Sequence, residues 1–199
     1  MIIDFNTDYI LENDRVRMNP IMASDLQYLQ HFVMDEPELW KYSLVSPTVI
    51  GMDGYIQVAL NGRQNEKEYA FIVFDKLHQK YAGSTRFYDI QPAADTVQLG
   101  FTWYGKHFQG TGLNKNCKYL MLEFAFEKMM AKRVEFRADN DNARSIAAMK
   151  SIGCTVEGIL RSNGYTASGQ RRDSIVLSIL ENEWNAIKAN LEFKIKTNI

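Results

Sequence analysis

Hydrophobic and polar residues alternate along the middle of the chain, and this pattern predicts strands. The stretches 69–74, 81–90 and 96–104 are rich in aromatic and β-branched residues, and short polar segments join them. Such spacing is expected for an antiparallel meander. In the third stretch every second residue from Val97 to Trp103 is apolar, so we expect this strand to bury one face.

Gly100 interrupts the third of these predicted strands. A glycine inside a strand often marks a β-bulge, or a place where another backbone or a ligand approaches closely. The sequence leaves both interpretations open.

Apolar residues with a spacing near 3.6 predict helices in other segments. Ser24 is expected to cap a first helix that carries Leu26, Leu29 and Phe32. A second helix is expected after Pro47. A third begins at the glycine-rich segment before Asn114, with Cys117, Leu120, Met121 and Phe124 on one face.

The C-terminal half alternates strands with helices. Asn142 is expected to cap a helix that ends at Gly153. The other expected elements are strands near 15–21, 133–139, 155–163 and 171–180, with a turn near Ser168 and Gly169, and a last short helix with Trp184 and Ile187. A meander followed by alternating helices and strands implies a mixed α/β sheet whose parallel part lies in the C-terminal half.

Length and charge narrow the possible functions. The 199 residues fit a single domain, 1–199, and a formal net charge of −1 gives no basic field for nucleic acid. No apolar run is long enough to span a bilayer, and no cleavable signal is evident. We therefore expect a cytoplasmic protein without nucleic-acid or membrane partners. Cys117 and Cys154 lack zinc-site spacing, so we expect two buried, reduced thiols and no metal.

Gly110 and Gly112 stand directly before a predicted helix. A helix N-terminus presents unpaired N–H groups, and glycines let these groups approach a phosphate without an intervening Cβ. An ordinary strand-to-helix turn would have the same pattern. The P-loop run of nucleotide-binding proteins is absent, and Lys115 stands where the dinucleotide fingerprint has its third glycine.

Three longer motifs carry a family resemblance. They are LGFTWYGKHFQGTGLNKNCKYLMLEFAFE, VEFRADNDNARSIAAMKSIGCTVEGILR and RRDSIVLSILENEW, in that order. Between about residues 95 and 185 the chain resembles the GNAT superfamily of acetyl-CoA-dependent N-acetyltransferases, and more narrowly its Rim-type ribosomal-protein branch. The resemblance implies a mixed, mostly antiparallel seven-stranded sheet, splayed between 96–104 and 133–139, with helices on both faces.

The resemblance also implies which residues hold acetyl-CoA. Pantetheine would pair with the backbone near Trp103 and Tyr104, and Asn142 would reach its amides, although Asn142 could be a plain N-cap. Ser145 would lie near the sulfur as the catalytic hydroxyl, or be an ordinary helix serine. The pyrophosphate would bind backbone N–H groups of Gln109, Gly110, Thr111, Gly112, Leu113 and Asn114.

Three positions depart from the family pattern. His107 stands where most members have Arg or Gln, and Met149 where many have a tyrosine general acid. Gln98 replaces a glutamate that activates the amine through water, and an amide cannot act as that base. These departures motivate an alternative function, an acyl-CoA-binding sensor or scaffold without turnover.

The implied reaction is attack of a neutral amine on the thioester. An α-amine titrates near 8 and a lysine amine near 10.4, so weak base machinery favours a protein N-terminus or another low-pKa amine, peptide or small molecule, as the acceptor. The chain is expected to be a monomer or a homodimer. Candidate bases are His107, Asp141, Glu135, Tyr104 and water. Candidate acceptor contacts are Trp40 and Tyr42, for which core packing is the alternative. Arg161, Arg171 and Arg172 are further candidates, for which exposed charges on a strand are the commoner interpretation.

Overall fold

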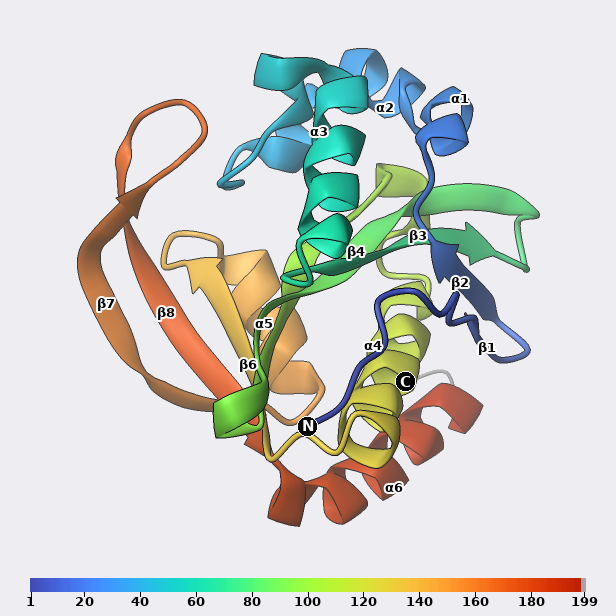
Figure 1. Cartoon of the computed structure of the whole chain (residues 1–199), viewed down its shortest axis with the longest axis vertical. Helices are drawn as coiled ribbons and strands as arrows, with labels where there is room; N and C mark the ends of the chain where they lie inside the picture. Colours follow the sequence, from blue (N-terminus) through green and yellow to red (C-terminus); the bar gives the residue numbers. More distant parts are fainter. Residues whose placement is uncertain (198–199) are drawn as a thin grey trace.

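One mixed sheet of eight strands organises the chain, in the order β1-β2-β3-β4-β5-β6-β8-β7. The structure is a computed structural model that describes residues 1–197 (Figure 1). The sequence predicted seven strands; the additional strand, β1, has two residues, too few to leave a periodic pattern. The strands are β1 Leu11–Glu12, β2 Val16–Pro20, β3 Tyr69–Asp75, β4 Lys80–Gln91, β5 Thr96–Tyr104, β6 Arg133–Asp139, β7 Thr155–Tyr165 and β8 Arg171–Leu180.

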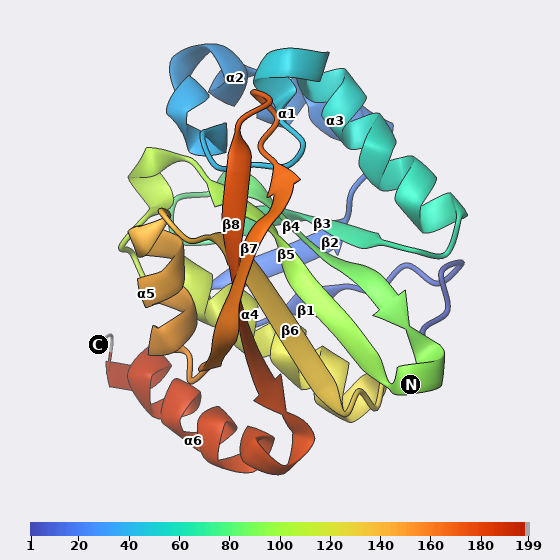
Figure 2. The same cartoon turned by 90° about the vertical axis from the view of Figure 1, so that its left-hand side faces the viewer.

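Helices connect and cover these strands (Figures 1 and 2). They are α1 Leu26–Leu29, α2 His31–Asp35, α3 Pro47–Gln64, α4 Leu113–Glu123, α5 Ala143–Ser151 and α6 Glu181–Thr197. A π-helical turn, Phe124–Lys128, continues α4. The last helix was expected to be short, but α6 has 17 residues. Within residues 1–197 no helix combines the length and the apolar character needed to cross a membrane.

The helices lie on both faces of the sheet, as predicted. Adjacent residues of a strand point to opposite faces, and in β4 the Arg86 guanidinium stacks on Tyr55 of α3 while Phe87 stacks on Phe124 at the end of α4. Thus α3 and α4 cover opposite faces. The buried core is continuous across both.

The predicted split in the sheet lies between β5 and β6. These strands are parallel, and they pair only where Thr96–Gln98 faces Arg133–Glu135. From Leu99 and Phe136 onward each strand continues without the other as a partner. Figure 1 shows the two strands, β5 in green and β6 in yellow, diverging from their paired ends. The opening predicted between 96–104 and 133–139 is confirmed.

A bulge lies in β5 at the interrupted position. Across from Ser84 and Arg86 of β4, the pairing in β5 skips from Trp103 to Gly100, and Phe101 has a φ of 48°. A Cβ on Gly100 would lie 2.9 Å from the Tyr88 ring. The bulge interpretation of the glycine is therefore confirmed, and the close neighbour is a side chain, not another backbone. The expected burial of a single face is not observed: Gln98 is buried between Val97 and Leu99, and Trp103 and Tyr104 are both buried.

Two of the three local predictions about helix ends are confirmed. Asn142 Oδ1 accepts the Ser145 N–H at 3.1 Å, and Gly153 ends this segment with a φ of 100°. The prediction for Ser24 is wrong: it lies inside a 3₁₀ turn, Ala23–Asp25. There Asp25 Oδ2 accepts the Met22 N–H at 2.8 Å instead. Cys117 and Cys154 are buried free thiols, as expected.

Candidate active site

Two glycines shape the loop between β5 and α4. Gly110 and Gly112 have φ angles of 74° and 82°, a left-handed conformation that glycine adopts without the Cβ strain of other residues. Gly112 is the N-cap of α4 and has no side chain to cap the helix. The first N–H groups of α4 therefore remain available at the loop, together with the positive end of the helix dipole.

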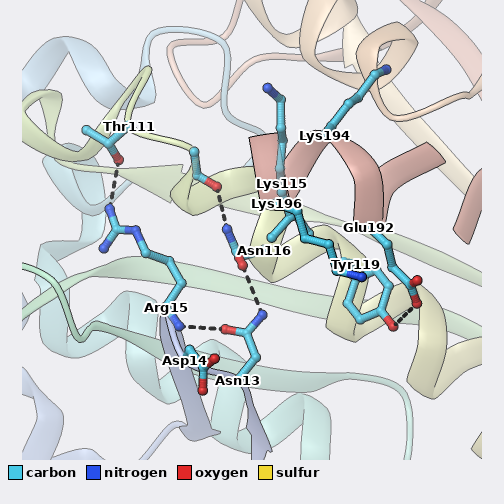
Figure 3. Close-up of a pocket in the computed structure, with 12 residues that line it drawn as sticks. Asn13, Asp14, Arg15, Thr111, Lys115, Asn116, Tyr119, Glu192, Lys194 and Lys196 are labelled. Atoms are coloured by element: carbon cyan, nitrogen blue, oxygen red, sulfur yellow. Dashed lines mark hydrogen bonds between the residues drawn. The ribbon is translucent and has the colours of Figure 1, made fainter. Parts of the chain in front are cut away.

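Hydrogen bonds from Arg15 and from Asn116 of α4 hold this loop in place. Arg15 Nη2 donates to Thr111 Oγ1 at 3.3 Å, and Asn116 Nδ2 donates to the Gly112 carbonyl at 3.0 Å. Asn13 Nδ2 in turn donates to Asn116 Oδ1 at 2.9 Å. Figure 3 shows these side chains along a cavity of about 620 Å³, which the C-terminal part of α6 also lines. The loop is thus preorganised by its own protein contacts.

Gln109 connects the loop to β5 and α5, next to the split in the sheet. Its Nε2 donates to the Tyr104 carbonyl at 2.7 Å, and its Oε1 accepts from Arg144 of α5. These two contacts place the loop next to the unpaired end of β5 and the N-terminus of α5.

A second cavity, of about 560 Å³, runs from this loop through the split between β5 and β6. Its walls include β5 from Gln98 to Tyr104, β6 from Phe136 to Asp139, and Asn142 and Ser145 from α5. Its far end reaches Tyr42 and the segment before α3. A single channel therefore connects the loop before α4, which has the geometry of a phosphate-binding loop, with the region around Tyr42, where a second molecule could be admitted.

Asn142 and Ser145 come together as predicted. Both line the 560 Å³ cavity. The Asn142 Oδ1 atom caps α5 by accepting the Ser145 N–H. The plain N-cap interpretation of Asn142 is therefore present in the structure, and this cap does not use the two N–H donors of its Nδ2 group.

Comparisons with known proteins decide the family. The model of the acetyltransferase (GNAT) domain matches residues 15–155 of the chain. This protein belongs to the GNAT acetyltransferases. The use of acetyl-CoA in an N-acetyl transfer follows from this membership, as the sequence motifs predicted.

Similar proteins support the same family. YdaF of Bacillus subtilis (strain 168), whose name describes a ribosomal N-acetyltransferase, is 27% identical over 106 residues, which are 53% of this chain and 57% of YdaF. The uncharacterized N-acetyltransferase p20 of Bacillus licheniformis is 23% identical over 180 residues, 87% of this chain and 97% of p20. A GCN5-related N-acetyltransferase from Brucella melitensis shares the fold, with a TM-score of 0.84 and 24% identity over 94% of this chain and 85% of that one.

The structure separates the candidate bases of this acetyltransferase. His107 packs edge-on against His78, and Glu135 pairs with Arg133 and Arg137. His107, Glu135 and Asp141 are not among the residues that line the channel. Tyr104 does line it. Burial and the neighbouring Cys117 raise the pKa of Tyr104 well above its ordinary value, so this phenol does not ionise near neutrality.

Gln98 has a carboxylate partner that sequence reasoning did not find. Its Nε2 donates to Asp89 Oδ2 at 2.6 Å. Asp89 follows Tyr88, the β4 residue that pairs with Gln98, and its φ of 46° places it in a bulge of β4. The amide that replaces the family glutamate is therefore held by a side chain from the next strand. No signal in the sequence joined these two positions, because only the sheet register brings them together.

Arg172, one of the candidate acceptor contacts, lines the channel, and so does Lys118, which the sequence did not predict there. Arg172 was expected on an exposed strand, as Arg161 and Arg171 indeed are. Its side chain is buried instead and donates to Ser174 Oγ at 3.2 Å and to the Tyr42 carbonyl at 3.3 Å. Lys118 lies on α4 among apolar residues and has 5% of its surface exposed. Its helical position gave no sign that the side chain enters the channel.

The aromatic residues of the segment before α3 have different roles. Trp40 is buried and packs edge-on against Trp103, with 5.1 Å between the ring centroids. Tyr42 lines the far end of the channel. Packing therefore accounts for Trp40, and Tyr42 remains available to an acceptor.

Proposed function

We propose that the channel holds acetyl-CoA with its pyrophosphate on the loop and its pantetheine in the split. The observation that carries this proposal is the continuous cavity from Gly110 to Tyr42 through the unpaired ends of β5 and β6. The backbone at Trp103 and Tyr104 would pair with pantetheine, and Asn142 Nδ2 would donate to one of its carbonyls. The loop residues that would bind the pyrophosphate are Gln109, Gly110, Thr111, Gly112, Leu113 and Asn114.

Acceptor and thioester would meet beside Ser145. The neutral amine attacks the acetyl carbon, and the C–S bond breaks with its electron pair going to sulfur. We assign to the Ser145 hydroxyl the donation of a proton to this sulfur, because Met149, which lies on the same wall, has no proton to give. Such donors contribute roughly 10²–10⁴-fold to a rate.

We expect Ser145→Ala to lower the turnover rate at least about tenfold while CoA affinity stays nearly constant. The Ser145 N–H, not its hydroxyl, makes the capping bond, so the substitution leaves α5 intact. Ser151→Ala, an exposed serine at the other end of the same helix, is the matched control. Steady-state thiol release at saturating substrates measures turnover. A Ser145→Ala rate equal to that of wild type would show that Ser145 is an ordinary helix serine without a catalytic role.

We further propose a protein or peptide N-terminus as the preferred acceptor. Neither Gln98 nor the buried Tyr104 can act as a base at neutral pH, which favours an amine that titrates near 8. The name of YdaF supports the same acceptor class. A small-molecule amine of similar pKa is the second possibility.

An acceptor panel tests the function. Acetyl-CoA is mixed with lysine-containing peptides that have a free α-amine and with the same peptides after N-formylation, which leaves only the lysine amine. Polyamines and aminoglycosides complete the panel. Thiol release only with the free α-amine is the expected result. Release only with small amines would reject the peptide acceptor, and tight CoA binding without release across the panel would favour the sensor, which none of the relatives described above is named for.

Two further proposals concern the domain organisation and the site of action. A single sheet and one continuous core from β1 to α6 support a single catalytic domain over 1–199. The free thiols of Cys117 and Cys154, together with the use of acetyl-CoA, support a cytoplasmic site of action.

A further inference from the structure

Lys118 extends from α4 into the split of the sheet. It lies one helical turn after Asn114, is 95% buried and lines the 560 Å³ channel. Its Nζ atom donates to Thr102 Oγ1 of β5 at 2.7 Å and to Thr85 Oγ1 of β4 at 3.5 Å, and it lies 5.9 Å from the Phe136 ring of β6. The amine is thus located between β5 and β6, on the α4 side of the channel.

This amine has no carboxylate partner within residues 1–197. The titratable groups that face it are two thiols, Cys117 on its own helix and Cys154 before β7, and burial raises the pKa of both thiols. They remain neutral near pH 7. A buried cation without a counter-charge is costly. Burial accordingly lowers the pKa of Lys118 to about 7.

The two hydroxyls next to Lys118 have hydrogen-bond partners other than its amine. Thr85 and Thr102 hydrogen-bond to each other at 2.7 Å, and Thr102 Oγ1 also reaches the Gly100 carbonyl at 3.3 Å. An ammonium has three N–H donors, and two of those of Lys118 are directed at these threonines. At least one N–H is left for whatever occupies the channel.

We propose that Lys118 donates a hydrogen bond to the carbonyl oxygen of the acetyl thioester, as a catalytic residue on the α4 side of the channel. The inference rests on the proposed function. As the amine nitrogen bonds to the acetyl carbon, the π electrons of the carbonyl move to oxygen, and Lys118 stabilises that charge without giving up its proton. When the C–S bond breaks, the electron pair on oxygen re-forms the C=O bond, and sulfur takes the C–S electron pair and the Ser145 proton. The surplus proton of the acceptor nitrogen returns through water to the Ser145 oxygen.

Occupation of the channel should change the protonation of Lys118. The pyrophosphate would bring negative charge to the loop, one turn of α4 away. That charge favours the ammonium form, so CoA binding near pH 8 should take up a proton. The acetyl oxygen and the pyrophosphate would then both be matched by positive charge on one helix.

The test compares Lys118→Met and Lys118→Gln with wild type, and Lys128→Met is the control because Lys128 is exposed and outside the channel. We expect kcat to fall about 10²–10³-fold in Lys118→Met, in the range found for loss of one oxyanion donor, with little change in KM for acetyl-CoA. Lys118→Gln, which keeps a neutral donor, should recover part of the rate.

Calorimetry of CoA binding in two buffers of different ionisation enthalpy provides the second measurement. Wild type and Lys128→Met should take up a proton at pH 8, and Lys118→Met and Lys118→Gln should not. Wild-type kcat in both Lys118 variants, or unchanged proton uptake in them, would overturn the proposal; if Lys118→Met fails to fold, Lys118→Gln decides. A wild-type protein that neither binds nor consumes acetyl-CoA would contradict the proposed function itself.

Discussion

Gly110→Asp is expected to weaken CoA binding roughly 30-fold, whereas Gly110→Asn stays close to wild type. A carboxylate about 5 Å from a phosphate costs about 2 kcal/mol in a partly screened site, which is about 30-fold in affinity. A Cβ on Gly110 meets no atom within 4 Å, so steric contact does not enter the comparison. Asn and Asp both tolerate the left-handed backbone that Gly110 adopts, and only Asp adds charge.

Isothermal titration of CoA into both variants checks this result. The unfolding midpoints of the two variants should agree with each other, because Gly110 is exposed and lies outside α4. The corresponding pair at Gly112, the N-cap of α4, should show the same preference for Asn. Equal affinities of the Asp and Asn variants at both positions would show that the pyrophosphate does not lie on this loop.

Lys118→Met is expected to be more stable than wild type at pH 6.5, and this advantage should shrink as the pH rises. The folded pKa of Lys118 is about 7, below its ordinary value of 10.5. Between these values the unfolded chain binds more protons than the folded one, so wild-type stability increases with pH. From pH 6.5 to 8.5 this gain amounts to about 2 kcal/mol, and the methionine variant lacks it.

Urea unfolding of both proteins at several pH values in that window measures the difference. The window ends at 8.5 because Cys117 and Cys154 have raised folded pKa values and would contribute the opposite trend at higher pH. Thr85 and Thr102 keep their mutual hydrogen bond in the variant, so no buried hydroxyl loses its last partner. A stability difference that stays constant from pH 6.5 to 8.5 would show that Lys118 does not titrate in this range.

The sequence predicted the long elements well because their signals are local. Strands β3 to β6 follow from periodic apolar residues, and the cap at Asn142 and the stop at Gly153 follow from side-chain and backbone preferences within a few residues. Errors occurred where local signals compete or are too short. Asp25 caps the turn in place of Ser24, and the two-residue β1 shows no period.

The loop could likewise be located from the sequence. Gly110 and Gly112 require no distant partner to be recognised, since their value lies in backbone freedom next to a helix N-terminus. The motif order then identified the family, which the domain match over 15–155 confirmed.

Other features of the site were decided only by the tertiary structure, because they depend on strand register and helix placement. The pairing of Gln98 with Asp89 depends on the bulge between β4 and β5, and the burial of Arg172 depends on the segment that contains Tyr42. In the sequence Lys118 cannot be told from an ordinary helix lysine. The packing of α4 next to the split is what directs its amine toward Thr102. By itself the sequence determined the elements, the loop and the family; the packing of distant segments decided which charged side chains enter the channel.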